Sequence, residues 1–318
     1  MIAICFSCLV LILLGRELGR RGILKKDAAK ALSAIIMTVS IPCLSFNAFM
    51  KDFKKEIFQV GFNIFIWSII LHLILMAISH LMYFRYKGDL KLVLRMLTIF
   101  GGVTVFGIPI VEALYGSEGI IYVSIFSISY RFFLYSYGYL KMSGTKVSVK
   151  NLKGVFLNPI ILATIVGMII WVGQSNEWIA YLRIDKTLPW LYKPSQYLAG
   201  LTSPLAWLLA GLNLSGLSFE KVLKCKVSWY YSFLKIVVVP LVTVVLLEFG
   251  NRIGFFPLSE LGITVVTLMM GTPTASIIIA YATQFEREEV ITSNCSFLST
   301  MCSIGFMPIL IYIIEILK

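Results

Sequence analysis

Residues 101–116 read GGVTVFGIPIVEALYG, and this stretch interrupts a long apolar run in which a membrane-spanning helix should be continuous. It carries Gly101, Gly102, Gly107 and Pro109. Proline removes a backbone hydrogen-bond donor from a helix and clashes with the preceding turn. Within a bilayer, such a break survives only where protein or a water-filled cavity supplies partners for the freed backbone groups. The stretch therefore predicts a broken helix inside a membrane protein.

A second interrupted stretch, MGTPTA at residues 270–275, lies late in the chain and is centred on Pro273. Interrupted membrane segments in corresponding places of two halves are the best sequence sign of a transporter binding site. Threonine hydroxyls beside the breaks can either bond a ligand or repair the interrupted helix. The candidate substrate-binding residues of the two breaks are Gly102, Thr104, Gly107, Pro109, Thr272, Pro273 and Thr274.

Composition places the whole chain in a membrane. Of its 318 residues 58% are hydrophobic and 14% are charged, against roughly 25% charged residues in soluble domains. The mean hydropathy is +0.88. The net charge of +12 lies mainly in loops between apolar runs, which indicates the positive-inside pattern rather than a nucleic-acid partner. We expect a multi-pass protein of the cell (plasma) membrane, surrounded by the lipid bilayer.

Ten apolar runs divide into two sets of five. The first set covers residues 1–140, a polar and basic segment at 141–153 links the halves, and the second set covers 154–318. An odd number of spans in each repeat places the two repeats in opposite membrane orientations. We therefore predict an all-α polytopic membrane protein with ten transmembrane helices in two inverted five-helix repeats.

The prolines support an internal repeat. Pro42 in the second run and Pro204 in the seventh are separated by nearly the same distance along the chain as Pro109 in the fourth run and Pro273 in the ninth. Lys and Arg are concentrated in the loops after the odd-numbered runs, including the 141–153 linker. The positive-inside rule makes these loops cytoplasmic and both termini extracellular.

Arg131 is the ionisable residue placed nearest the middle of a span. A charge there costs at least about 2.5–3.5 kcal/mol, so it usually faces a cavity or a partner. Arg131 either binds an anion beside the broken helices or pairs structurally with Glu112 or a helix C-terminus. Lys235 either acts in the site or extends to the cytoplasmic surface. Glu112 is either a polar gate or a residue of the outer rim, and Asn294 is a further polar candidate.

Broken helices also offer anion-binding groups of their own. The N-terminus of a half-helix exposes unpaired N–H groups at the positive end of its dipole, which suits carboxylates and phosphates. No catalytic or metal-binding pattern accompanies them, because His72 and His80 have no HExxH-type spacing. We predict neither an enzyme nor a bound metal or cofactor. The coupling ion, H+ or Na+, is left open.

Short motifs follow one another along the whole chain in a specific order. They are Ile41-Pro42 with Leu44–Met50, Phe106–Pro109 with Ala113–Gly116, Asn158-Pro159, Thr202–Leu205 leading to Gly211, Pro240, and Thr272–Ala275. In order and spacing the chain resembles the auxin efflux carrier family of bacterial and plant membrane transporters.

The resemblance implies that the fourth and ninth helices are broken and cross each other. It implies a scaffold domain of spans 1, 2, 6 and 7, and a transport domain of spans 3–5 and 8–10 that moves like an elevator. It also implies a homodimer formed through the scaffold. Substrates in this family are typically organic anions such as auxin, malate or malonate.

The chain departs from the family pattern at two places. Gly102 stands where the family commonly has Asn before the first crossover. Tyr130-Arg131 precede Ser136–Gly138, where the family commonly has Asn before a Ser/Thr-x-Gly segment. A ligand-binding amide is thus replaced by a cation.

We expect secondary transport of a small organic anion by alternating access. Arg131 would attract the anion, and the N-termini at the two breaks would hold it. One alternative is a sodium-coupled carrier of the bile-acid-symporter architecture. Another is a non-transporting membrane sensor, although no appended soluble domain is recognisable. A membrane enzyme would need a catalytic cluster that the sequence does not present.

Overall fold

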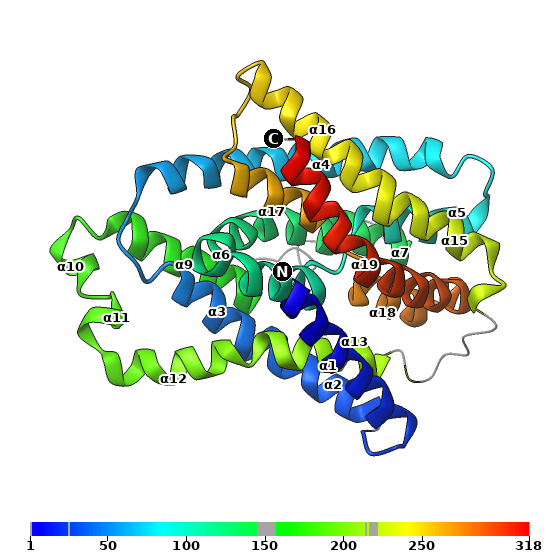
Figure 1. Ribbon diagram of the computed structural model, residues 1–318, viewed down its shortest axis with the longest axis horizontal. Helices are drawn as coiled ribbons and strands as arrows, with labels where there is room; N and C mark the ends of the chain where they lie inside the picture. Colours follow the sequence, from blue (N-terminus) through cyan, green and yellow to red (C-terminus); the bar gives the residue numbers. More distant parts are fainter. Residues whose placement is uncertain (1, 25, 145–156, 214, 216–221, 318) are drawn as a thin grey trace.

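The computed structural model describes residues 2–24, 26–144, 157–213, 215 and 222–317 (Figure 1). Regular structure in these ranges is helical, and the one β-type pairing is an isolated antiparallel bridge between Gly101 and Thr274. Most of the predicted 141–153 linker lies outside the described residues.

Among the described residues of the first half there are eight α-helices or π-turns before Leu134 and two from Leu134 onward. The π-turns, labelled η, are single wider turns that continue into the next α-helix. The elements are α1 (Ile2–Arg20), α2 (Lys26–Ile35), η1 (Ile36–Ser40), α3 (Ile41–Ala48), α4 (Lys55–Met82), α5 (Gly88–Ile99), η2 (Val103–Gly107), α6 (Ile108–Phe133), η3 (Leu134–Gly138) and α7 (Tyr139–Ser143).

The described residues of the second half likewise form α-helices and a π-turn. It contains α9 (Pro159–Gly173), α10 (Glu177–Ala180), α11 (Ile184–Thr187), α12 (Pro189–Gly200), α13 (Thr202–Asn213), α15 (Lys226–Phe233), η4 (Leu234–Val238), α16 (Val239–Arg252), α17 (Glu260–Met270), α18 (Ser276–Gln284) and α19 (Glu289–Leu317).

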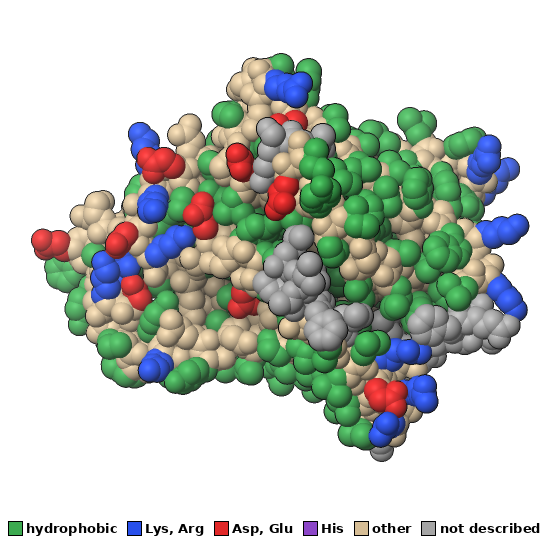
Figure 2. Space-filling view, in the orientation of Figure 1, with side chains coloured by type: hydrophobic (Ala, Val, Ile, Leu, Met, Phe, Trp, Pro, Cys, Tyr) green, Lys and Arg blue, Asp and Glu red, His purple; other side chains and the backbone are tan. Residues whose placement is uncertain are grey.

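Five helical segments of the described chain are long and apolar enough to cross a membrane. They are Asp27–Ala48, Lys55–Met82, Val103–Ser143, Lys226–Arg252 and Glu289–Ile316. Pro159–Gly173 and Glu260–Met270 are shorter apolar helices. Figure 2 shows hydrophobic side chains across the middle of one face, with Lys and Arg dominating its right edge and both signs of charge at its left. These features support a multi-pass membrane protein, and the count of ten spans stays a prediction.

Three prolines that the sequence places inside helices follow π-turns rather than breaks. Pro42, Pro109 and Pro240 each come two residues after the end of η1, η2 or η4. At η2, for example, the Ile108 N–H bonds to the carbonyl oxygen of Val103, five residues earlier. The wider turn relieves the clash between the proline ring and the preceding turn. Proline is therefore accommodated within a continuous helical segment.

The first break consequently lies earlier than expected. Gly107 and Pro109 stand in helical backbone, so the expectation that they form the interruption is wrong. The chain leaves helical geometry at Phe100–Gly102 instead, and a second interruption covers Gly271–Ala275. A further kink inside α6 falls at Gly116, whose φ of 57° is a left-handed conformation that suits glycine.

Small residues allow α1 to lie directly against α13. A Cβ atom added to Gly15 would come within 3 Å of the Leu208 carbonyl oxygen, and one added to Gly211 would meet the carbonyl oxygen of Ile12 equally closely. Such glycines let two helix backbones touch, which is how membrane helices commonly associate. Around this pair, α3 packs against α9 and α12, while α4, α6 and α17 pack on one another.

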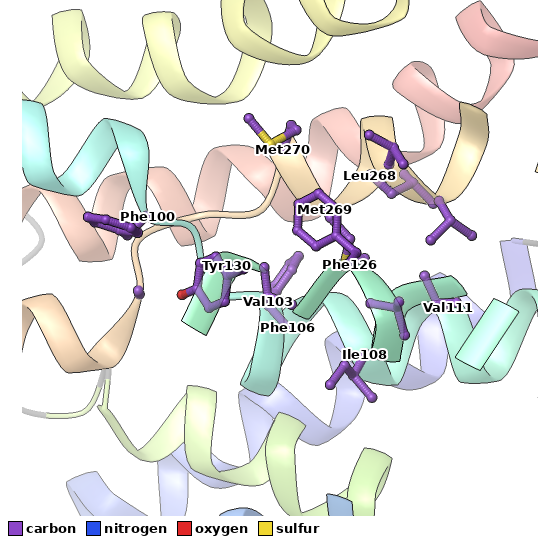
Figure 3. Packing of buried hydrophobic residues seen from close by; sticks show 14 of the residues in the cluster. Phe100, Val103, Phe106, Ile108, Val111, Phe126, Tyr130, Leu268, Met269 and Met270 are labelled. Atoms are coloured by element: carbon purple, nitrogen blue, oxygen red, sulfur yellow. The ribbon is translucent and has the colours of Figure 1, made fainter. Parts of the chain in front are cut away.

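The largest group of buried apolar side chains surrounds the two breaks. Figure 3 shows Phe100 and Val103 from the first break in the same cluster as Met269 and Met270 at the end of α17. All four are at most 2% exposed. The breaks are thus enclosed by protein, as interrupted backbone in hydrocarbon requires.

Candidate functional site

Backbone groups freed at one break find partners at the other. The Gly102 N–H donates to the Pro273 carbonyl oxygen at 2.6 Å, and the Ala275 N–H donates to the Phe100 carbonyl oxygen at 3.3 Å. These two bonds flank the bridge between Gly101 and Thr274. The interruptions therefore complete each other's hydrogen bonding, which removes most of the cost of breaking a helix in a membrane.

Tyrosine hydroxyls bind further carbonyls near the breaks. Tyr130 of α6 donates to the Gly101 carbonyl oxygen at 2.6 Å. Tyr231 of α15 lies 3.2 Å from the Leu97 carbonyl oxygen and 2.8 Å from the Thr274 hydroxyl. Nothing in the sequence around Tyr130 or Tyr231 marks them as partners of residues so distant along the chain, and sequence reasoning missed both.

Lys235 lies at the second position of η4 and is 1% exposed. Its ammonium donates to the carbonyl oxygens of Thr98 and Met270, at 3.0 Å each. These two residues belong to the last turns of α5 and α17. Lys235 therefore does not extend to the surface, and it contacts the C-terminal ends of both interrupted helices.

The hydroxyl groups of both threonines of the second break already have hydrogen-bond partners. The Thr272 hydroxyl donates to the Met269 carbonyl oxygen at 2.7 Å, and Thr272 is fully buried. The Thr274 hydroxyl lies 3.2 Å from that of Ser299, in addition to its contact with Tyr231. These contacts favour helix repair over ligand binding for Thr272, whereas the Thr274 hydroxyl is held by two other hydroxyl groups. Asn294 lies half-buried in α19, apart from these hydrogen bonds.

Arg131 and Thr104 are brought together beside the first break. The Arg131 side chain is 1% exposed, and its Nη2 donates to the Thr104 hydroxyl at 3.1 Å. Its Nη1 is buried and has no hydrogen-bond partner among the described residues. A buried guanidinium nitrogen without a partner loses its hydration without compensation. Arg131 therefore has an unused donor that an anion could satisfy.

The surroundings of Arg131 add positive potential instead of cancelling its charge. Thr104 is the second residue of the helical segment that begins at Val103, so the guanidinium lies at the positive end of that helix. Within the described residues, no carboxylate lies within ion-pair distance of Arg131. A helix N-terminus together with a buried cation is an arrangement suited to a bound anion.

Glu112 has a different partner from the one the sequence left open. Its carboxylate accepts a hydrogen bond of 2.5 Å from the Ser203 hydroxyl, which also lies 3.4 Å from the Pro109 carbonyl oxygen. Ser203 belongs to α13, whereas Glu112 and Pro109 belong to α6. The contact thus joins the helix that carries Arg131 to the helix that packs along α1. Ser203 belongs to the Thr202–Leu205 motif, but the sequence did not mark it as the partner of Glu112.

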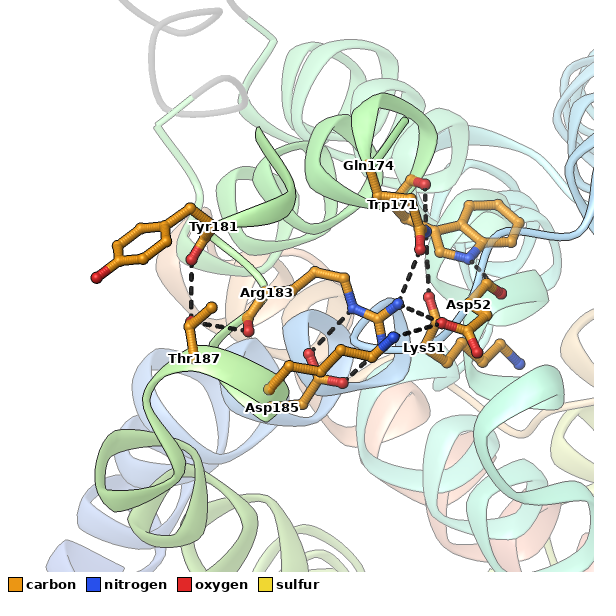
Figure 4. Close-up of polar contacts among 9 residues, drawn as sticks. Lys51, Asp52, Trp171, Gln174, Tyr181, Arg183, Asp185 and Thr187 are labelled. Atoms are coloured by element: carbon orange, nitrogen blue, oxygen red, sulfur yellow. Dashed lines mark hydrogen bonds and ion pairs between the residues drawn. The ribbon is translucent and has the colours of Figure 1, made fainter. Parts of the chain in front are cut away.

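A second charged cluster, also missed from the sequence, lies at the loops on the left of Figure 1. Figure 4 shows Arg183 between the carboxylates of Asp52 and Asp185. The guanidinium nitrogens lie 2.6 Å from an oxygen of each, and the Lys186 ammonium lies 2.9 Å from Asp52. The hydrogen bond from Arg183 lowers the pKa of Asp52, and Asp185 raises the pKa of Arg183. The cluster fastens the segment between α3 and α4 to the loop that follows α9.

The comparisons with known proteins agree with the motifs. The sequence model of a family described as membrane transport protein matches residues 2–153 and 143–312. A search of curated proteins found no significant match. The two matched stretches together cover nearly the whole chain. This chain therefore belongs to the membrane transport protein family, the auxin efflux carrier family that its motifs resemble.

Proposed function

We propose that this protein is a secondary transporter of a small organic anion and that Arg131 binds a carboxylate of that anion. The observation that carries the proposal is the buried Nη1 of Arg131, which has no hydrogen-bond partner in the described part of the chain. The family supplies the class of activity, because its members are membrane transporters and not enzymes. The chemistry of Arg131 supplies the sign of the substrate's charge.

The charge balance around Arg131 supports a substrate with one or two negative charges. The guanidinium carries one positive charge, and the N-terminus of the helix beginning at Val103 adds about half a charge. Leaving such a charge uncompensated inside a bilayer protein costs several kcal/mol. A carboxylate can accept from the free Nη1 and from N–H groups of the first helical turn, so that binding removes this cost.

The proposed transport cycle moves the Arg131 site relative to α13. In this proposal, the division implied by the resemblance to the auxin efflux carrier family puts α4–α7 and α15–α19 in the moving part. It puts α1–α3, α9, α12 and α13 in a scaffold, through which two copies would associate. Glu112 and Ser203 face each other across the boundary between the two parts. Their hydrogen bond must break when the moving part slides, so it stabilises one end state of the cycle. Both termini are placed outside the plasma membrane in this scheme.

Thermal melting of the purified protein tests the assignment of Arg131. Malate, malonate and indole-3-acetate are added one at a time, with matched neutral amides and organic cations as comparison ligands. A bound carboxylate raises the melting temperature by mass action. One charge-assisted hydrogen bond contributes about 1.5–3 kcal/mol, so Arg131→Gln should weaken the binding of the stabilising anion by roughly 10- to 150-fold.

Arg95→Gln is the matched control, because Arg95 is a half-buried arginine whose donors already bind Ser79, Tyr137 and the Met76 carbonyl oxygen. It should leave the anion affinity unchanged. Stabilisation by neutral or cationic ligands alone, or an unchanged affinity in Arg131→Gln, would contradict the proposal. Uptake into proteoliposomes separates the remaining alternatives: a strict need for a Na+ gradient favours the sodium-coupled carrier, and binding without uptake favours a sensor.

A further inference from the structure

Lys235 is the second fully buried cation of the described chain, and its surroundings differ from those of Arg131. Both of its hydrogen bonds go to backbone carbonyls, those of Thr98 and Met270. No carboxylate forms an ion pair with it in the described ranges. A buried ammonium needs compensating negative charge, which at Lys235 must come from groups other than carboxylates.

The ends of two helices supply that charge. The C-terminus of an α-helix carries about half a negative charge, spread over carbonyls that have no partner in the helix. α5 ends at Ile99 and α17 ends at Met270, and Lys235 reaches the last turn of each. Two such ends together carry about one negative charge, which matches a single ammonium.

The packing around the ammonium leaves little space for an additional ion. A Cβ atom added to Gly101 would lie 3.2 Å from the Lys235 Nζ and even closer to the Thr272 hydroxyl. The π-turn η4 places Lys235 at this point, two turns of backbone away from the exposed Lys226 on the same helical segment. The ammonium therefore occupies the position where a free monovalent cation would meet the carbonyls of both broken helices.

We propose that Lys235 is a built-in cation at the place where the two interrupted segments, Phe100–Gly102 and Gly271–Ala275, meet. It holds the C-terminal ends of α5 and α17 together. Removing its side chain opens a site for a small monovalent cation. Lys235 is a positioning residue, because it acts through backbone carbonyls and does not touch the substrate. It leaves the opposite, N-terminal ends of the interrupted helices available for an anion. This role of Lys235 stabilises the contact between the two breaks and does not depend on the identity of the substrate.

Chemical rescue tests this role. Lys235→Ala removes Cγ, Cδ, Cε and Nζ, which together have the size and charge of n-propylammonium. The variant should melt lower than the wild type by roughly 5 °C or more. Propylammonium chloride should restore most of this loss in Lys235→Ala, and choline chloride at the same ionic strength should not, because choline is too large for the space. Lys226→Ala, which removes an exposed lysine, is the matched control and should show neither the loss nor the rescue.

Two further measurements keep the test decisive if Lys235→Ala does not fold. Lys235→Met keeps the volume of the side chain without its charge, so it should melt lower than the wild type and gain nothing from propylammonium. The wild type should melt at the same temperature in propylammonium chloride and in choline chloride, because its cation site is filled by Lys235. A wild-type melting temperature retained in Lys235→Met, or equal stabilisation of Lys226→Ala or of the wild type by propylammonium, would overturn the proposal. None of these outcomes bears on anion binding by Arg131, so the two proposals fail separately.

Discussion

Gly101 is the position where the structure makes the sharpest prediction about stability. A Cβ atom on residue 101 would fall within 3 Å of the Thr272 hydroxyl oxygen, 3.1 Å from the Thr272 carbonyl oxygen and 3.2 Å from the Lys235 Nζ. With Gly101→Ala the Thr272 hydroxyl must move aside, and the Thr272 carbonyl oxygen, which cannot rotate away, must give by a few tenths of an ångström, so the contact between the two breaks is strained. The hydrogen bonds that join Gly102 to Pro273 and Ala275 to Phe100 lie on either side of this contact and would lengthen.

The expected loss follows from those two bonds. Leaving a buried backbone group without its partner costs about 1–3 kcal/mol, so losing both bonds amounts to about 2–6 kcal/mol. If only the Thr272 side chain moves, the loss is its hydrogen bond to the Met269 carbonyl oxygen, about 1 kcal/mol. Losing both bonds, at about 2–6 kcal/mol, corresponds to a decrease in melting temperature on the order of 5–15 °C.

The assay is thermal unfolding of the purified variants, followed as a double-mutant cycle. Thr272→Ala removes the hydroxyl that the new methyl group would strike, so Gly101→Ala with Thr272→Ala should lose less stability than the two single losses added together. Gly305→Ala is the control, because a Cβ on Gly305 of α19 would meet no atom within 4 Å. Alanine is the better helix former, and this control should not be destabilised. A Gly101→Ala melting temperature within about 1 °C of the wild type would refute the close contact of the two breaks.

Two other predictions concern the rest of the fold. Gly211→Ala should lower the melting temperature, because its Cβ would clash with the Ile12 backbone. Gly200→Ala is the control and should not lower it, because a Cβ there would meet no atom within 4 Å. Equal effects of the two substitutions would contradict the packing of α1 on α13. Asp52→Asn measures how much the charged cluster around Arg183 contributes to stability. The pKa of Asp52 is lowered in the folded protein, so its contribution is present above the unfolded-state pKa of about 4 and is lost as the pH falls through the lower, folded-state value. The difference in melting temperature between wild type and Asp52→Asn should therefore be largest near pH 7 and shrink below about pH 4, and a difference independent of pH would contradict it.

Apolar length and the positions of glycine and proline were enough to predict a multi-pass helical protein with two interrupted segments. They do not place the first interruption, because the pattern points to Pro109 as the breaking residue, whereas the chain leaves helical geometry at Phe100–Gly102. The structure shows that a π-turn before Pro109 absorbs the missing N–H, just as π-turns do before Pro42 and Pro240. Whether a proline breaks a helix or follows a wider turn depends on the surrounding packing, which one sequence does not reveal.

At the candidate site, too, the sequence identifies the buried cations but not the groups that they contact. Arg131 and Lys235 are both recognisable in the sequence as charges within apolar runs. Their different surroundings are set by tertiary contacts: Arg131 meets Thr104 from the same half of the chain, while Lys235 meets carbonyls from both halves. Partners such as Ser203 for Glu112 and Asp52 for Arg183 come from segments about a hundred residues away and carry no local signal.

The bridge between Gly101 and Thr274 has a consequence for biosynthesis. The two residues are separated by more than half of the chain, so the ribosome completes the first break long before it makes the second. During that interval the Phe100 carbonyl and the Gly102 N–H lack the partners they have in the finished protein. These two backbone groups acquire their final partners only after the segment around Pro273 has been made. The backbone pairing at the first break is therefore complete only when the two halves of the chain have docked.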